Sequence, residues 1–436
     1  MNRRTRLTII GIGAGVYGLS GPGQTAGFSV FVDPVSAALG LSRAELTTIY
    51  LGATLLAAPT GIWLGRHLDR QRTATMIRIV ATMLATALVI VALAPSAPIL
   101  ALGVFGLRAF GQSGMSLTST VLVARAIDVR RGAALGWLAA LAGFAITLTP
   151  LLASRVIPVA GWRQTWLLLA ATVLIGSYLL AGLTGRLNLD GNGRAATDAH
   201  EHDDHEHDEH ETEPDTVDDV AADGEIVATE RQRRWALVVV TSAVATTGGV
   251  VTALAFHQIA VLGERGLSAT AAATNFLPQS IAAATCAILV GRAVDRLPGR
   301  LVLASVMGVL ILALASLWLV DSPVTAVLFG LLLGTGVAAN HASEGALLVR
   351  WTGTEGLGAR RGRMMAIAVA ATAVAPLTFT LLSDLTGSFT RAASVLTVLP
   401  LIVAVGALSA PLAEPKLWSR AESSGVLEAV ANHDEA

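Results

Sequence analysis

The chain repeats one residue pattern 226 positions apart, and this repeat limits the possible fold more than any other feature. Gly40-Leu41-Ser42 begins an apolar run that ends in Gly-Arg-His-Leu-Asp-Arg at 65–70. Gly266-Leu267-Ser268 begins a second run, ending in Gly-Arg-Ala-Val-Asp-Arg at 291–296, and the offset stays at 226 across these 31 residues. Two similar halves in the same orientation are typical of parallel-repeat membrane transporters, whose substrate site lies between the halves.

Composition agrees with a membrane protein, because 53% of the 436 residues are hydrophobic and only 14% are charged. Twelve apolar runs are each long enough, at about 17–20 residues, to cross a bilayer as a helix. They lie near 7–31, 46–64, 74–94, 98–124, 133–157, 164–185, 235–260, 270–290, 301–320, 323–349, 364–386 and 391–413, and we number the expected helices 1 to 12 in this order. We therefore expect an all-α polytopic fold with six-helix bundles at 1–185 and 235–413, a linker at 186–234 and a tail at 414–436.

Basic residues indicate the orientation of the chain. With a cytoplasmic N-terminus, 23 Arg and Lys fall in inner segments and 5 in outer loops. Because cytoplasmic loops carry the excess of positive charge, we expect both termini and the linker in the cytoplasm. Arg supplies 29 of the 30 basic residues, which together with abundant Ala indicates a bacterial coding bias and hence a bacterial cytoplasmic membrane. A net charge of −1 gives no reason to expect a nucleic-acid partner.

The linker holds 16 of the 31 acidic residues and five of the nine histidines. Such polar sequence cannot bury a core, so we interpret it as a disordered tether. Irregular His and carboxylate spacing can also bind Zn²⁺, Ni²⁺ or Cu²⁺ weakly, which keeps a metal-responsive role open. The weak candidate ligands are His200, His202, His205, His207 and His210. No other metal site is expected.

Six helices followed by six more, a long central linker, and a duplicated Gly-x-x-x-Asp-Arg loop resemble the major facilitator superfamily. Within it, Arg130-Arg131-Gly132 entering helix 5 and Gly161-Trp162-Arg163 before helix 6 are similar to the monocarboxylate-porter and oxalate/formate-antiporter branch. The resemblance implies a secondary transporter, not an enzyme, that moves a small organic solute such as a monocarboxylate by alternating access. It further implies proton coupling, a monomer in the lipid bilayer, and no cofactor.

The duplicated loop has a role that can be argued from its residues. A glycine at a helix end permits close backbone approach, and an aspartate there can accept hydrogen bonds from helix N-termini or pair with Arg. Such contacts would hold helices together on the cytoplasmic side in one state and release them in the other. A turn glycine within ordinary positive-inside topology is the alternative. The expected gating residues are Gly65, Asp69, Arg70, Gly291, Asp295 and Arg296.

Ionisable and amide side chains within the apolar runs are candidates for binding substrate or protons, because lipid exposure is costly for them. Arg108 lies about 15 Å deep at ~1.5 Å per residue from the helix start, in a segment that resembles the helix-4 arginine motif of the superfamily. Its permanent charge suits an anionic substrate or a carboxylate partner, and capping of neighbouring carbonyls is the alternative. The candidates are Tyr17, Gln24, Arg108, Gln112, His257, Gln258, Asn275, Gln279, Asn340, His341 and Glu344.

Three of these candidates share helix 10. Asn340 and Glu344 lie on one face at i, i+4, and His341 lies beside Glu344 at i, i+3. His and Glu are typical of proton relays in membranes. Glu344 also precedes Arg350 closely, so a position at the cytoplasmic interface is the other interpretation.

Helix 1 and helix 8 contain further polar or irregular positions. Gly21-Pro22-Gly23 should interrupt helix 1, which membrane proteins tolerate where backbone lines a cavity. Asn275 and Gln279 in helix 8 fit a helix-packing hydrogen bond at least as well as a substrate contact.

Two other functions remain open at this stage. A proton-driven drug or metabolite efflux antiporter has the same fold, although the helix-5 Gly-Pro signature is absent because Pro150 follows Thr149. A non-transporting sensor could use the His-rich linker as its metal-responsive element. An ATP-driven pump is disfavoured, because no Gly-x-x-x-x-Gly-Lys-Ser/Thr occurs.

Overall fold

The computed structural model describes residues 3–127, 131–187, 230–352 and 357–410, without the side chains at 62, 69, 131–133, 287–296 and 357–359. Within these ranges the secondary structure is entirely helical. The first half contains α1 (Arg3–Gly18), η1 (Gly21–Gly23), α2 (Thr25–Ser29), α3 (Val32–Leu39), α4 (Arg43–Ala57), α5 (Thr60–Arg70), α6 (Thr73–Leu93), α7 (Ala97–Gly106), the π-helix η2 (Leu107–Met115), α8 (Ser116–Ala126), α9 (Arg131–Ala160) and α10 (Trp162–Arg186). The second contains α11 (Glu230–Glu264), α12 (Ala269–Thr274), α13 (Phe276–Arg296), α14 (Gly299–Ser316), η4 (Leu317–Leu319), α15 (Pro323–Thr352), α16 (Leu357–Thr386), α17 (Phe389–Leu396) and α18 (Val398–Ser409).

Eight helical stretches among the described residues are long and apolar enough to cross a membrane. They are Thr73–Leu93, Ala134–Ala160, Trp162–Arg186, Glu230–Glu264, Gly299–Leu319, Pro323–Thr352, Arg360–Thr386 and Phe389–Ser409. The other four runs of the twelve are divided. Helix 1 breaks at Gly21–Gly23 as predicted, whereas the divisions at Pro59, at η2 and at Asn275 were not predicted. The division at Pro59 follows from its missing N–H, which cannot continue the hydrogen bonds of the preceding helix, so Pro59 becomes the N-cap of α5.

The backbone repeats its turns with the offset seen in the sequence. Gly40 and Gly266 both have positive φ, at 62° and 86°, and each precedes a serine N-cap. Gly161 and Gly387 form a second pair with positive φ, at 86° and 69°. Only glycine adopts this left-handed region without strain, so the turns require these residues. The two halves therefore share their turn geometry as well as their motifs.

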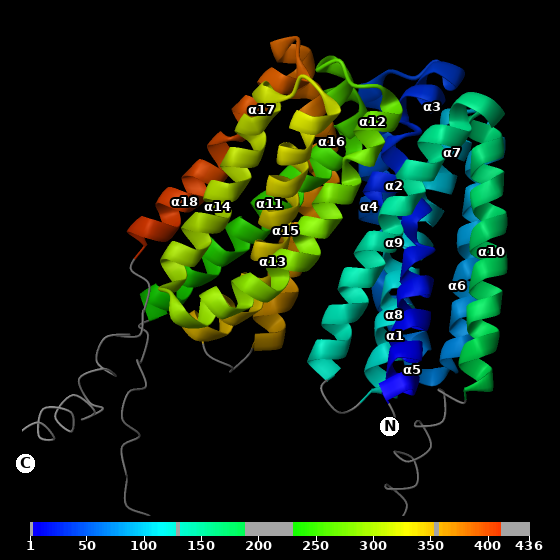
Figure 1. The fold of residues 1–436 in the computed structure, drawn as a ribbon, viewed down its shortest axis with the longest axis horizontal. Helices are drawn as coiled ribbons and strands as arrows, with labels where there is room; N and C mark the ends of the chain where they lie inside the picture. The colour runs from blue at the N-terminus through cyan, green and yellow to red at the C-terminus, as the bar shows by residue number, and fades with distance from the viewer. Residues whose placement is uncertain (1–2, 128–130, 188–229, 353–356, 411–436) are drawn as a thin grey trace, which may run out of the picture.

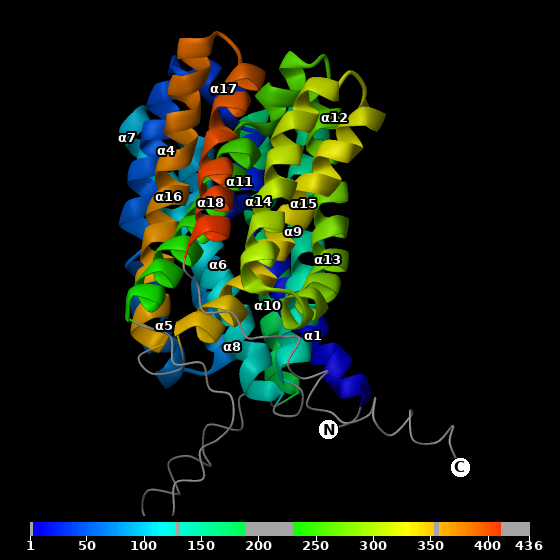
Figure 2. The ribbon, with the colours of Figure 1, turned by 90° about the vertical axis from the view of Figure 1, so that its left-hand side faces the viewer.

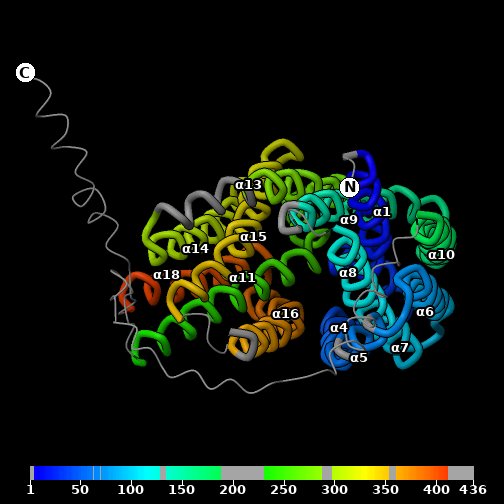
Figure 3. Tube along the Cα trace, turned by 90° about the horizontal axis from the view of Figure 1, so that it is seen from below, coloured from blue at the N-terminus to red at the C-terminus, as the bar shows by residue number. Residues whose placement is uncertain are grey.

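The two halves lie side by side as separate helical bundles (Figures 1 and 3). We call the end where α1 begins and α10 ends the proximal end, and the opposite end, where α4 begins and α11 ends, the distal end (Figures 1 and 2). The charge pattern predicts that the proximal end is cytoplasmic.

The halves pack against each other chiefly through four helix pairs, α4 with α16, α9 with α13, α2 with α11 and α9 with α12. Phe256 of α11 is fully buried and belongs to the apolar core of the first half, where its ring lies 5.7 Å from Phe28 and 4.7 Å from Tyr50. Near the middle of α15, by contrast, the side chain of His341 is 70% exposed although α15 packs against α11, α13 and α14. Aromatic packing around Phe256 thus joins the halves toward the distal end.

Candidate functional site

Arg108 is buried at the centre of the first half and only 4% exposed. Its Nε donates to Thr54 Oγ1 at 3.1 Å, and its Nη1 donates to the Gly23 carbonyl at 3.3 Å and to Thr25 Oγ1 at 3.5 Å. The guanidinium also lies over the Tyr50 ring, 4.7 Å from the centroid. Among the described residues no carboxylate lies within ion-pair distance of Arg108. The site is therefore a buried positive charge held by neutral acceptors.

Two local irregularities create this site. The break at Gly21–Gly23 frees backbone carbonyls of helix 1, and the π-helix η2 carries Arg108 in the facing helix. A Cβ added at Gly23 would lie 2.4 Å from the Leu107 carbonyl oxygen and 2.7 Å from Gly111 Cα. The backbones therefore touch where the helices cross, which brings the Gly23 carbonyl within reach of the guanidinium. π-Helical segments are frequent at functional sites.

The other first-half candidates surround this crossing. Gln24 donates to Ser20 Oγ at 2.9 Å, and the Tyr17 hydroxyl hydrogen bonds with Ser116. Gln112, one turn after Arg108, has a buried Oε1 without a hydrogen-bond partner. An unpaired buried amide oxygen is costly and suits a donor supplied by a ligand.

Sequence analysis missed Tyr50 and Thr54, which complete the surroundings of Arg108. Both are buried on α4, where they lie at i, i+4, and Tyr50 accepts or donates a 2.7 Å hydrogen bond with Thr25. Two polar side chains at i, i+4 within the second apolar run were the sequence signal that could have identified them. Tyr50 also contacts Phe256, so it links the Arg108 site to the second half.

Three amide candidates form one network inside the second half. Gln279 donates to Gln258 Oε1 at 2.8 Å and to Asn275 Oδ1 at 3.3 Å. Gln258 donates to the Ala272 carbonyl and Asn275 to the Ala326 carbonyl. These bonds join α11, α12, α13 and α15, as the helix-packing alternative anticipated.

The candidates of the predicted helix 10, which is α15 in the structure, form a second cluster in this half. Asn340 and Glu344 are 2% and 6% exposed, and each has a buried side-chain oxygen without a hydrogen-bond partner. His341 Nδ1 and Arg361 Nη2 each lie 4.0 Å from a Glu344 carboxylate oxygen. Glu344 is thus buried within the protein and has two cationic or titratable neighbours, while its position relative to the cytoplasmic interface stays a prediction.

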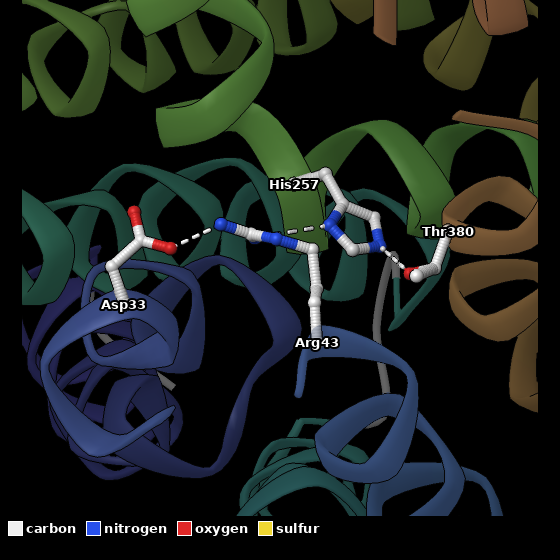
Figure 4. A network of polar contacts seen from close by, with 4 residues as sticks. All are labelled: Asp33, Arg43, His257 and Thr380. Atoms are coloured by element: carbon white, nitrogen blue, oxygen red, sulfur yellow. Dashed lines mark hydrogen bonds and ion pairs between the residues drawn. The ribbon is translucent and has the colours of Figure 1, made fainter. Parts of the chain in front are cut away.

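His257 lies apart from both clusters, at the distal contact between the halves (Figure 4). Its ring is 1% exposed and contacts Arg43 of the first half and Thr380 of α16. Arg43 also pairs with Asp33. Sequence analysis counted Arg43 only as an outer-loop charge, and its partners come from distant segments that no local pattern connects.

The expected gating loops are instead the last turns of helices, since α5 ends at Arg70 and α13 at Arg296. The close approach expected at Gly65 is absent, because a Cβ there would meet nothing within 4 Å. Arg70 is exposed. The side chains of Asp69, Asp295 and Arg296, and the surroundings of Gly291, lie outside the described residues, so their gating role stays a prediction.

No group of three or more potential metal ligands occurs among the described residues. The candidates His200, His202, His205, His207 and His210 fall in the linker, outside the described ranges. Metal binding by the linker therefore stays a hypothesis.

The fold and the paired halves define a multi-pass membrane protein of the transporter class. The sequence profile of the Major Facilitator Superfamily matches residues 13–263. The chain belongs to this superfamily.

Two solved structures resemble the whole chain. Both are of a bacterial homologue of the human lysosomal transporter Spinster in an inward-facing conformation. The unoccupied form has a TM-score of 0.66 and 14% identity, covering 94% of this chain and 98% of that one. The occupied form has a TM-score of 0.64 and 15% identity, covering 94% and 97%. No curated protein matches the sequence. The resemblance to the monocarboxylate-porter branch stays a prediction.

Proposed function

We propose that this protein is a secondary active transporter that moves a small organic anion, such as a monocarboxylate, across the bacterial cytoplasmic membrane by alternating access, with proton coupling. The observation that carries the proposal is Arg108, a buried guanidinium without an acidic partner among the described residues. A buried charge in a bilayer is expensive, so it is retained where it binds or couples charge.

The Arg108 site offers what a carboxylate needs. The planar guanidinium can donate two parallel hydrogen bonds, and its bonds to Gly23 and Thr25 are long, at 3.3 and 3.5 Å. A carboxylate is a stronger acceptor than a carbonyl or hydroxyl, so it can compete for these donors. Tyr50 gives the site a side chain in contact with the second half.

Glu344 is the group we assign to proton binding. Its carboxylate is nearly buried, one oxygen lacks a hydrogen bond, and His341 and Arg361 lie 4.0 Å away. Protonation would remove a buried charge and give the side chain a donor. A group of this kind can link proton uptake to movement of the second half.

Transport of carboxylates into proteoliposomes tests the proposed function. With an inward-directed proton gradient, we expect uptake of at least one small monocarboxylate, competition by other monocarboxylates, and loss of uptake with a protonophore. Matched neutral amides serve as control competitors, because they keep the shape and lose the charge. Equal competition by the amides would contradict an anion site, and uptake that ignores the proton gradient would contradict coupling.

Replacement of the linker separates transport from sensing. A neutral Gly/Ser stretch in place of Ala199–Asp223 should leave uptake within about twofold of wild type, because a flexible tether needs only length. The measurement is uptake by the variant and by the native chain, each with and without added Zn²⁺ or Ni²⁺. Loss of uptake, or metal dependence confined to the native linker, would favour the sensor interpretation.

A further inference from the structure

We propose that His257 is a proton-binding site that controls the distal contact between the two halves, with Arg43 as its partner across the interface. This proposal rests on alternating access in the proposed function and is independent of the substrate. It assigns a binding role to a contact outside the Arg108 site and the helix-10 cluster.

The contact joins the halves through charged and aromatic groups. Arg43 Nη1 lies 3.4 Å from His257 Nδ1, and the same guanidinium pairs through Nη2 with Asp33 (Figure 4). Arg43 also lies over the Phe389 ring, 5.4 Å from its centroid. One first-half side chain therefore contacts both α11 and α17 of the second half.

The start of α4 fixes Arg43 in place. Ser42 is the N-cap, and its side chain and backbone exchange hydrogen bonds with Glu45 in a capping box. Hydrogen bonds from the Ser42 backbone and side chain hold the pKa of Glu45 below its usual value. The ionised carboxylate of Glu45 therefore accepts hydrogen bonds from both the backbone and the side chain of Ser42.

The hydrogen bonds of His257 define its protonation state. Arginine carries only donors, so the contact requires Nδ1 to accept. Nε2 then carries the proton and donates toward the Pro376 carbonyl at 3.1 Å, with Thr380 Oγ1 also at 3.1 Å. Thr380 donates to the same carbonyl, which leaves its lone pairs free to accept. The contact is thus specific for the neutral imidazole.

A second proton on His257 is incompatible with this contact. It would place an N–H on Nδ1 facing an N–H of Arg43. It would also bring two positive charges together beside the aromatic side chains of Phe256, Phe379 and Phe389. The imidazole is 1% exposed and the Arg43 side chain 25%, so water screens the repulsion less than it would at an open surface. Protonation and the closed distal contact therefore exclude each other, and proton binding favours the state in which the distal ends separate.

The other charged groups near the contact have separate partners. Asp33 is paired with Arg43 on the side away from the imidazole. Glu264, at the end of α11, accepts hydrogen bonds from the backbone of Phe389 and Thr390 and from the Thr390 hydroxyl. Neither carboxylate is within hydrogen-bond or ion-pair distance of His257, so neither neutralises a charged imidazole directly.

The distance between the distal ends provides the test. Spin labels at Ala38 of α3 and Leu385 of α16, both exposed, are placed in a Cys286→Ser background and measured in nanodiscs without substrate. In the wild-type chain, the long-distance population should grow as the pH falls from about 8 to about 5.5, where imidazoles change charge. One bound proton changes the population ratio by at most about tenfold per pH unit.

Two variants remove the switch in different ways. His257→Gln keeps an acceptor and a donor without titrating, and should stay in the short-distance state at every pH. Arg43→Gln removes the repelling charge and should show no pH response. His67→Gln is the matched control, because His67 lies on α5 at the proximal end and is exposed; it should respond like the wild type.

Four results would overturn the proposal: a wild-type distance that ignores pH, a wild-type response in His257→Gln, the same in Arg43→Gln, or loss of the response in His67→Gln. Failure of carboxylate uptake would reject the anion substrate without altering these distances. The two hypotheses are therefore tested independently.

Discussion

Transport by an Arg108→Ala variant is expected to fall at least about 100-fold, because two charge-assisted hydrogen bonds to a carboxylate are together worth about 3 kcal/mol or more. Removal of Arg108 leaves the hydroxyl groups of Thr54 and Thr25 without their donor, and water can take its place. The variant should therefore reach the membrane at normal abundance. Initial uptake rate per reconstituted protein, measured across pH, is the readout.

Two further arginine variants sharpen this prediction. Arg108→Lys keeps the charge and loses the planar fork, so transport should be impaired and not abolished. Arg78→Ala is the matched control, because Arg78 lies on α6 and is exposed; it should transport normally. If Arg108→Ala kept the wild-type uptake rate and pH profile, Arg108 would only hold helix 1 and helix 4 together and would take no part in transport.

The repeat explains why so much of the fold could be predicted. Turn glycines, serine caps and helix ends recur at the same offset, so Gly40 predicts the turn at Gly266, and Arg70 predicts the helix end at Arg296. These are local features, set by φ preference and capping, and local features are visible in a sequence.

The site was only partly predictable for the same reason. The helix-1 break follows from Gly21-Pro22-Gly23, and the pairing of His341 with Glu344 follows from helical spacing. The contact between Arg43 and His257 joins residues 214 positions apart and depends on how the halves dock. Docking is a tertiary property, so sequence analysis assigned these two residues to a loop and to a helix without connecting them.

Other differences have a similar origin. Sequence analysis expected the substrate site between the halves, whereas Arg108 is buried inside the first half, where the carbonyl freed at Gly23 reaches it. The close approach assigned to Gly65 occurs at Gly23 and Gly111. A glycine indicates that backbones can approach closely, and only the fold shows which glycines are used in this way.

Gly23→Ala is expected to disturb both the packing of the first half and the Arg108 site. The new methyl group would meet the Leu107 carbonyl oxygen at 2.4 Å and Gly111 Cα at 2.7 Å, and both are backbone atoms that cannot rotate away. Overpacking of this kind typically costs about 1–3 kcal/mol. Separation of the two helices would also withdraw the Gly23 carbonyl from Arg108, so transport should be lost together with thermal stability.

Gly11→Ala, in the preceding part of helix 1, is the matched control, because a Cβ there meets nothing within 4 Å. It should unfold at the wild-type temperature or slightly above, since alanine is favoured over glycine within a helix by about 1 kcal/mol. Thermal unfolding in detergent and uptake in proteoliposomes are measured for both variants. If Gly23→Ala unfolded at the wild-type temperature and transported normally, the crossing of η1 and η2 could not be what positions Arg108. The guanidinium would then have to be held by Thr54 and Tyr50 alone.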